Sequence, residues 1–433
     1  MAHRALPYLG LPSEQSSTQM VGSFMTTEAL PQVRPRTVKY LKRQEAIVLA
    51  ASQILNQKGL KGMSLGDIGE HLKMTPTGVA YYFANKEELA AACFQRSIET
   101  FNHFIADAAT EPTVIGRLKR LIILVLSFHR DVASGEIPAI AQADDIRALG
   151  DPEVIGAYVE MFRQTRALFR KPELEPAPRS TTNARVHFLV QQFWWMNLWL
   201  PHYQPEDFER ITDRFIDIIM NGIGAPGHRW APELLTLPET NVGGREDPHE
   251  VFLRAATQLI NEQGYHGASV DRISARLDVT KGAFYHHIDA KDDLVVVCFR
   301  RTTEVVRRTQ VAAQKLPVDG HSRLASALNS LIEHQLLGDA PLLKGATVSL
   351  PVGIRQDILK DYERNAVRFG SMISDGQADG SLRLVDVQIA AQITAAAVNG
   401  MGELTYWLPG APEQHAGENY LRPLFNGLTA GLE

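Results

Sequence analysis

The sequence predicts an all-α protein built from two related halves. Residues 45–99 recur at 250–304 without a gap, and 17 of the 55 aligned positions are identical. A repeat of this length is a duplicated domain, because solenoid units repeat every ~20–50 residues. In each copy, apolar residues return at the spacing i, i+3, i+4, i+7, which is typical of a helix with one buried face.

The duplication extends beyond these copies. The tripeptide Trp-Leu-Pro at 199–201 returns at 407–409, and the pair Asn-Gly at 221–222 returns at 426–427. Each half therefore spans about 200 residues. Prolines and glycines concentrate in 225–248, as expected of a linker. The expected segments are a flexible tail (1–35), a first helix-turn-helix domain (36–100), a first helical ligand and dimerisation domain (101–224), a linker (225–248), a second helix-turn-helix domain (249–305) and a second helical ligand and dimerisation domain (306–433).

The composition is that of an ordinary globular protein. Of 433 residues, 45% are hydrophobic and 21% are charged, and the net charge is -5. No apolar run reaches the ~18 residues of a membrane-spanning helix, and no signal peptide is evident, so we expect a cytoplasmic protein with no membrane partner. Cys93 and Cys298 occupy equivalent positions of the two copies, where we expect buried apolar side chains. We expect no metal site and no cofactor.

Local signals divide each copy into short helices. Gly59 and Gly264 follow the first helix and suit a left-handed residue there. Ser64, with Asp67 three residues later, predicts a capped second helix. Thr75 is placed to cap a short third helix, and a longer fourth helix begins near residue 86. The order of helix, short helix, tight turn and short helix predicts a helix-turn-helix in each half.

A helix-turn-helix reads DNA because its second helix fits the major groove, which is ~12 Å wide. Side chains at the start of that helix reach base edges, and the polar groups around it bind phosphate. The predicted DNA contacts in the first copy are Lys73, Thr75, Thr77, Tyr81, Tyr82 and Lys86, and those in the second are Arg272, Thr280, Lys281, Ala283, Tyr285, His286, His287 and Lys291. Of Tyr81 and Tyr82, one is expected to face DNA and the other to pack.

At these positions the chain resembles the TetR/AcrR family of bacterial transcriptional regulators. The motif residues of the second copy include Gly264, Tyr265, Gly267, Ala268, Ser269, Ile273, Val279, Thr280, Lys281, Gly282, Phe284, Tyr285, His286, His287, Lys291 and Leu294. The first copy departs from the pattern with Pro76, Thr77 and Ala80, and the second departs with Ile288. The first head (34–100) carries ten basic and six acidic residues, whereas the second (239–305) carries eight and eleven, so the first attracts phosphate better and the second has the better motif.

The resemblance implies a three-helix DNA-binding head on a helical bundle with an effector pocket and a dimerisation face. Its partners would be a double-stranded DNA operator and a small hydrophobic effector. Two arrangements stay open: an intramolecular pseudo-dimer whose heads lie ~34–36 Å apart, or a homodimer with four heads. The candidate effector residues are aromatic, since such pockets are largely apolar, and the same residues also suit a core or interface: Tyr158, Trp194, Trp195, Trp199, Tyr362 and Trp407.

The sequence thus favours a ligand-responsive transcriptional repressor with two non-identical heads. A ligand-sensing or scaffolding protein whose heads have lost DNA binding is the alternative, motivated by Pro76, Thr77 and Ala80. An enzyme of small hydrophobic substrates is a third possibility, although we find none of the common phosphate-binding, zinc or nucleophile motifs.

Overall fold

The computed structural model describes residues 37–142, 146–170, 178–236, 241–242, 245–246, 248–267, 270–277, 291–338, 341–343, 352–408 and 416–430. The all-α class is confirmed, since a two-residue antiparallel pair, β1 (Asn241–Val242) with β2 (Arg245–Glu246), is the only sheet in these ranges. None of the described helices combines the length and the apolar character needed to cross a bilayer.

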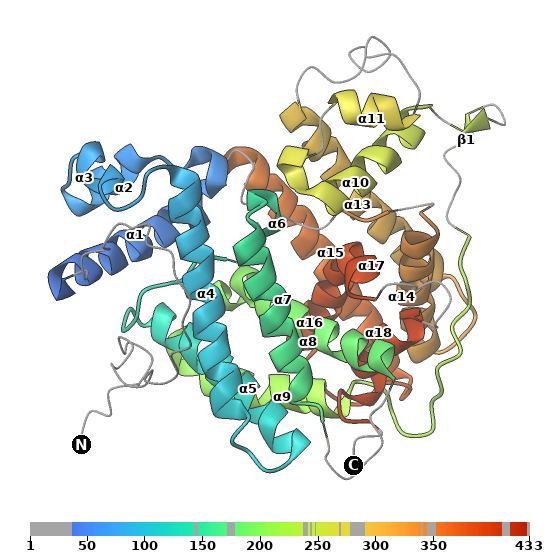
Figure 1. The fold of residues 1–433 in the computed structure, drawn as a ribbon. Helices are drawn as coiled ribbons and strands as arrows, with labels where there is room; N and C mark the ends of the chain where they lie inside the picture. The colour runs from blue at the N-terminus through green and yellow to red at the C-terminus, as the bar shows by residue number, and fades with distance from the viewer. Residues whose placement is uncertain are drawn as a thin grey trace, which may run out of the picture.

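The first half forms a head and a bundle (Figure 1). Its elements are α1 (Val38–Gly62), α2 (Leu65–Leu72), α3 (Pro76–Ala80), α4 (Lys86–Ala108), α5 (Val114–Ala133), α6 (Ile146–Leu149), α7 (Pro152–Ala167), α8 (Arg179–Trp199), η3 (Leu200–His202), η4 (Pro205–Asp207) and α9 (Phe208–Asn221). The glycine predicted at the end of the first helix, Gly59, has a φ of 68° and marks a kink after which α1 continues for three residues.

The second half repeats this order. Its elements are α10 (Pro248–Gly267), α11 (Val270–Leu277), α13 (Lys291–Gln314), α14 (Gly320–Leu337), α15 (Val352–Ala378), α16 (Val387–Gly400), η6 (Met401–Glu403), α17 (Leu404–Trp407) and α18 (Ala416–Asn426). The two heads share contacts at an offset of 205. In the first, Arg96 pairs with Glu45 at 2.9 Å, and in the second Arg301 pairs with Glu250, the Nε–Oε1 distance being 2.6 Å.

The two halves meet through α8 and α9 of the first and α16 and α18 of the second. At the centre of this contact the backbone amide of Ile223 donates to Leu424 O at 2.9 Å, and the amide of Leu428 donates to Ile219 O at 2.8 Å. Adding 205 to either member of the first bond, or subtracting it, gives the residues of the second. The two bonds are therefore reciprocal, as across a two-fold axis.

Two glycines permit this close approach. Gly222 and Gly427 have φ values of 70° and 85°. A Cβ atom on Gly222 would lie 2.2 Å from Phe425 O, and one on Gly427 would lie 2.1 Å from Met220 O. The repeated Asn-Gly pair of the sequence is thus the point where the two backbones touch.

The first part of the predicted linker packs on α14. The amide of Leu235 donates to Ser330 Oγ at 2.8 Å, and its carbonyl lies 3.0 Å from His334 Nε2. The Leu235 side chain is buried. The segment up to residue 236 therefore packs against the second bundle. The limits of the linker, residues 225 and 248, stay a prediction.

Candidate nucleic-acid interface and ligand cavity

The turn of the first helix-turn-helix is tight. Lys73, which ends α2, has a φ of 53°, and it is the only residue other than glycine at positive φ in the described ranges. The amide of Met74 donates to Gly69 O at 2.7 Å. A Cβ atom on Gly69 would lie 2.7 Å from Met74 O, so the glycine lets α3 turn back closely against α2.

The sequence explains why α3 starts where it does and which side it exposes. Thr75 is the N-cap, and its Oγ1 accepts from the amide of Gly78 at 3.1 Å. Pro76 takes the first helical position, where no amide donor is needed. Val79 is fully buried, whereas Thr75 and Thr77 are exposed. The polar side of this short helix therefore faces outward.

The tyrosine pair that follows α3 is divided between surface and packing. Tyr81 is 73% exposed, whereas Tyr82 is half-buried and packs on the core of the head. Tyr40 of α1, which sequence analysis missed, lies with its ring 4.7 Å from that of Tyr82 and 6.1 Å from that of Tyr81. The spacing of Tyr40 from the head motif gave no signal of this contact, because it depends on how α1 packs against α2 and α4.

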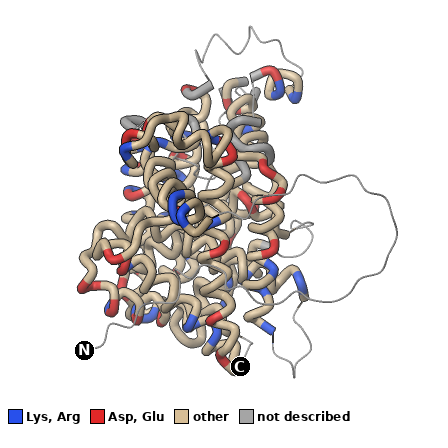
Figure 2. The backbone as a smooth tube through the Cα atoms, turned by 60° about the vertical axis from the view of Figure 1, so that its left-hand side comes forward, with Lys and Arg blue, Asp and Glu red and all other residues tan. Residues whose placement is uncertain are grey.

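The lysines of the first head differ in their surroundings. Lys73 is exposed, whereas Lys86 Nζ donates to the backbone carbonyl of Leu60, near the end of α1, at 3.2 Å. Lys39 and Lys42 add two exposed positive charges near the start of α1. Figure 2 shows basic and acidic positions interspersed over the described chain, so a phosphate group would be attracted by nearby basic side chains rather than by the net charge.

Less of the predicted second interface is described. Arg272 is exposed on α11, and Lys291 is the first residue of α13. The side chain of Lys291 lies outside the described residues. The remaining predicted contacts also lie outside them: Thr280, Lys281, Ala283, Tyr285, His286 and His287.

A cavity of about 410 Å³ lies in the first bundle, beside the head. Its wall is mainly apolar, and no Lys, Arg, Asp or Glu is among the described residues that line it. The aromatic members are Phe101, Phe128, Phe193, Trp194, Tyr203 and Phe208, and the polar members are Asn56, His129, Gln142, Asn197 and Gln204. Burial lowers the pKa of His129 from 6.5 to about 4, so its ring is neutral at pH 7.

Of the six predicted effector residues, only Trp194 lines this cavity. Its Nε1 donates to the hydroxyl of Tyr158 at 3.0 Å, so Tyr158 supports the wall from behind. The rest lie in other packing contacts of the bundles. Trp195 donates to Gln392 and meets the ring of Tyr362, Trp199 stacks on Phe215, and Trp407 stacks on Phe162 at 3.9 Å.

Most of the cavity wall carries no signal in the sequence. Phe128 ends the longest apolar stretch, Leu121 to Phe128, and His129 follows it. The wall draws on α1, α4, α5, residues 139–142, α8 and the segment from η3 to the start of α9, so no local pattern brings its members together.

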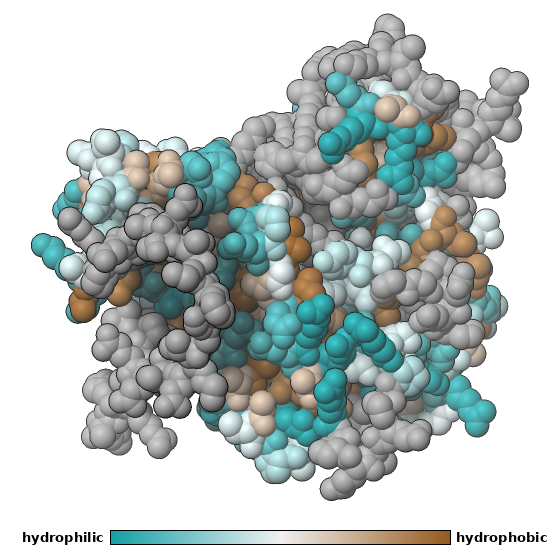
Figure 3. All heavy atoms as spheres, in the orientation of Figure 1, coloured by the Kyte–Doolittle hydropathy of each residue, from teal (hydrophilic) through white to brown (hydrophobic). Residues whose placement is uncertain are grey.

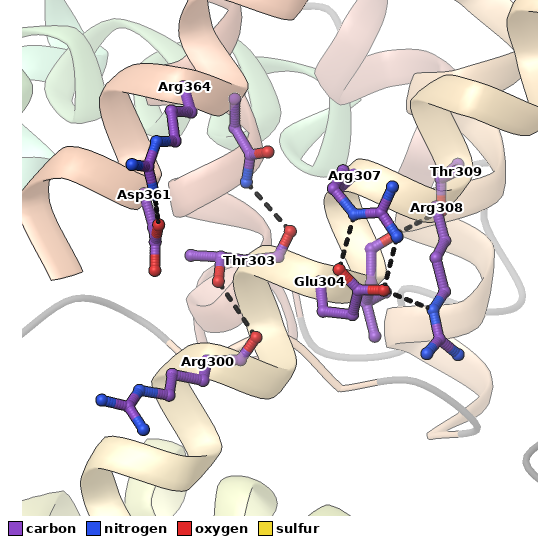
Figure 4. A network of polar contacts seen from close by, with 10 residues as sticks. Arg300, Thr303, Glu304, Arg307, Arg308, Thr309, Asp361 and Arg364 are labelled. Atoms are coloured by element: carbon purple, nitrogen blue, oxygen red, sulfur yellow. Dashed lines mark hydrogen bonds and ion pairs between the residues drawn. The ribbon is translucent and has the colours of Figure 1, made fainter. Parts of the chain in front are cut away.

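A second depression, of about 830 Å³, lies between α13 and α15 (Figure 4). Its lining is charged, and neighbouring side chains pair within it. Glu304 accepts from Arg307 and Arg308, which lowers the pKa of Glu304 to about 2, and Arg364 pairs with Asp361 at 2.7 Å. This lining does not suit an apolar effector.

Comparison with known proteins assigns both heads to one family. The model described as bacterial regulatory proteins, tetR family, matches residues 47–93 and 252–298. The chain is 31% identical over 139 residues to the HTH-type transcriptional repressor DhaR of Mycobacterium sp. strain GP1, covering 30% of this chain and 68% of that protein.

Two further relatives match over shorter parts. The transposon Tn10 TetC protein of Escherichia coli is 34% identical, with 20% of this chain and 42% of its own length covered. The HTH-type transcriptional activator FasR of Mycolicibacterium smegmatis is 26% identical, with 25% and 50% covered.

The solved structures that match cover about two fifths of the chain. A TetR/AcrR regulator from Thermobifida fusca YX-ER1 is 21% identical and has a TM-score of 0.32, with 42% of this chain and 98% of that chain covered. AibR in complex with isovaleryl coenzyme A and operator DNA is 15% identical and has a TM-score of 0.31, with 41% and 97% covered. The two family matches and the likeness to DhaR show that the chain belongs to the tetR family of bacterial regulatory proteins.

Proposed function

We propose that this protein is a sequence-specific DNA-binding transcriptional regulator with two different heads in one chain. The observation that carries the proposal is the exposed side of α3, where Thr75, Thr77 and Tyr81 face outward on a capped helix-turn-helix. Such a helix enters the major groove with its first residues at base edges. The family match at the second head, residues 252–298, supports a second reader of the same kind.

The two halves act as the two subunits of an intramolecular pseudo-dimer. The reciprocal amide bonds at Ile223 and Leu428 support this, because a two-fold contact between like subunits has the same form. Among the described residues visible in Figure 3, hydrophobic side chains form patches separated by hydrophilic ones. One chain would then bind two unlike half-sites, since Thr75-Pro76-Thr77 corresponds to Thr280-Lys281-Gly282.

The cavity beside the first head is the effector site. Its largely apolar wall and neutral polar groups favour a small, largely apolar molecule without net charge. A charged ligand would lose its hydration with no opposite charge on the wall to replace it. Binding there would release the operator, and repression is the outcome we propose, as in the name of DhaR.

The test is selection of genomic DNA fragments by the purified chain, followed by gel shift on the selected site. We expect an asymmetric site with two half-sites about one helical turn apart. Thr77→Ala should relax specificity in one half-site, and Lys281→Ala should weaken binding through the other. Selection of no fragment would refute the regulator and favour the sensing or scaffolding protein. A symmetric site bound by two chains would refute the pseudo-dimer and leave DNA binding intact.

A further inference from the structure

The cavity and the first head share a side chain. Asn56 of α1 lines the cavity, and its Nδ2 donates to Ile140 O at 2.8 Å. Its Oδ1 accepts from the amide of Gln142 at 2.9 Å. Ile140 and Gln142 line the same cavity, so the backbone of residues 139–142 is both cavity wall and partner of the head.

The second half repeats the arrangement. Asn261, which is Asn56 plus 205, donates from Nδ2 to Leu342 O at 2.7 Å. The fourth helices repeat it too. Ser97 Oγ donates to Ala141 O at 2.8 Å, and Thr302 Oγ1 accepts from the amide of Leu343 at 2.8 Å. In each half, therefore, the first and fourth helices hold the segment that follows the fifth.

The same connection reaches the other head. Residues 139–142 are separated by three residues from α6, and α6 lies against α10 of the second head. In the opposite direction Arg355 of α15 donates to the backbone carbonyl of Asn56 at 3.3 Å. Each head is thus held by its own half and by the other one.

Building on the proposed function, we propose that Asn56 is a positioning residue that couples the cavity to the first head, and that the same connection carries cavity occupancy to the second head through α6. A molecule in the cavity displaces residues 139–142, because they form its wall. This displacement breaks the hydrogen bonds of Asn56 to Ile140 and Gln142. It also shifts the chain segment that leads into α6. One cavity then governs two heads.

A covalent probe removes the need for a known effector. Ala133 lines the cavity and is exposed at its edge, so Ala133→Cys can be labelled with N-phenylmaleimide, a neutral aromatic reagent. The native thiols do not compete, because both are buried and burial raises the pKa of Cys93 to about 12 and that of Cys298 to about 11. Mass spectrometry reports the extent of labelling.

The readout is amide hydrogen exchange in α1 and α10, with and without the label. Two lost hydrogen bonds correspond to roughly 5- to 30-fold faster exchange. In the Ala133→Cys chain we expect this acceleration in both helices on labelling. With Asn56→Ala added, α1 should exchange faster already without label and respond no further, while α10 still responds. Asn261→Ala is the matched control, in which α10 is faster from the start and α1 keeps its full response.

The outcomes separate the claims. A response of α1 that survives in Asn56→Ala overturns the role of Asn56, and a labelled chain whose α10 does not change overturns the path through α6. Asn56→Asp keeps the acceptor for Gln142, so it replaces the alanine variant if that one does not fold, with a reduced response of α1 expected. Gel shift on the selected operator is independent. An exchange response without operator binding refutes the regulator alone, and binding without the response refutes the coupling alone.

Discussion

Replacing Gly222 by alanine should destabilise the protein far more than replacing another glycine that also has a positive φ. The backbone at Gly222 has a φ of 70°, and a Cβ atom there would lie 2.2 Å from Phe425 O. With a ψ of -176°, this backbone conformation is nearly confined to glycine, and an alanine there costs about 1–3 kcal/mol. Forcing an extra carbon into a packed contact costs about 1–3 kcal/mol more. We therefore expect a loss of about 2–6 kcal/mol in the free energy of unfolding.

Gly380 is the matched control. Its φ is 81°, yet a Cβ atom there would have no neighbour within 4 Å. Gly380→Ala should therefore cost only the backbone part, about 1–2 kcal/mol. Gly427→Ala, across the contact, should behave like Gly222→Ala, since its added Cβ would lie 2.1 Å from Met220 O.

The assay is guanidinium denaturation at equilibrium, followed by circular dichroism and by tryptophan fluorescence to check that the two transitions coincide. Equal losses for Gly222→Ala and Gly380→Ala would refute the reasoning, because the close approach of the two halves would then contribute nothing. A loss at Gly222 without one at Gly427 would refute the reciprocal form of the contact.

Four further outcomes follow from the same structure. Lys73→Asn should raise the stability of the first head by up to about 1 kcal/mol, since asparagine tolerates positive φ. The same change should reduce the slope of operator affinity against salt concentration, on logarithmic axes, by about one. An unchanged slope excludes a phosphate contact of Lys73. Lys281→Ala should lower the same slope by about one through the second head, as read by gel shift at several salt concentrations. His129 has a pKa of about 4 in the folded chain and about 6.5 in the unfolded chain. Between these values the unfolded chain binds more protons, so stability falls as the pH drops from 6.5 to 4. His129→Asn should flatten this pH dependence in denaturant titrations, and an unaltered pH profile would contradict the role of His129. Native-state hydrogen exchange should be faster in α10 than in α1, because the described core of the second head is a separate small cluster whereas that of the first is continuous with the bundles; equal protection contradicts this.

Local features of the head could be predicted from the sequence. Ser64 and Asp67 form the capping box that their spacing indicates, and Thr75 caps α3. These contacts join residues three positions apart, so they depend only on the local sequence. Cys93 and Cys298 are buried as expected, because they repeat in the apolar stripe of a duplicated helix.

Features that depend on distant segments could not be predicted. Tyr82, the tyrosine of the pair that packs, lies against Tyr40, which is more than 40 residues away along the chain. The members of the aromatic stretch at 194–199 lie in different environments. Trp195 donates to Gln392 of the second half, whereas Trp194 lines the cavity. A composition rich in tryptophan fits both environments, and only the packing of α8 on α16 separates them.

The contact between the halves keeps two-fold positions while its chemistry has diverged. Trp195 Nε1 donates to Gln392 Oε1 at 3.0 Å, and His187 Nε2 lies 2.8 Å from Gly400 O. Adding or subtracting 205 exchanges these two pairs, so a tryptophan in one half occupies the position of a glycine in the other. A Cβ atom on Gly400 would lie 2.6 Å from Cγ of Gln191, which belongs to the first half. Two first halves in this geometry would place Trp195 of each copy against Gln191 of the other, and a side chain larger than glycine does not fit there without rearrangement. The chemistry of this contact therefore disfavours a pair of first halves.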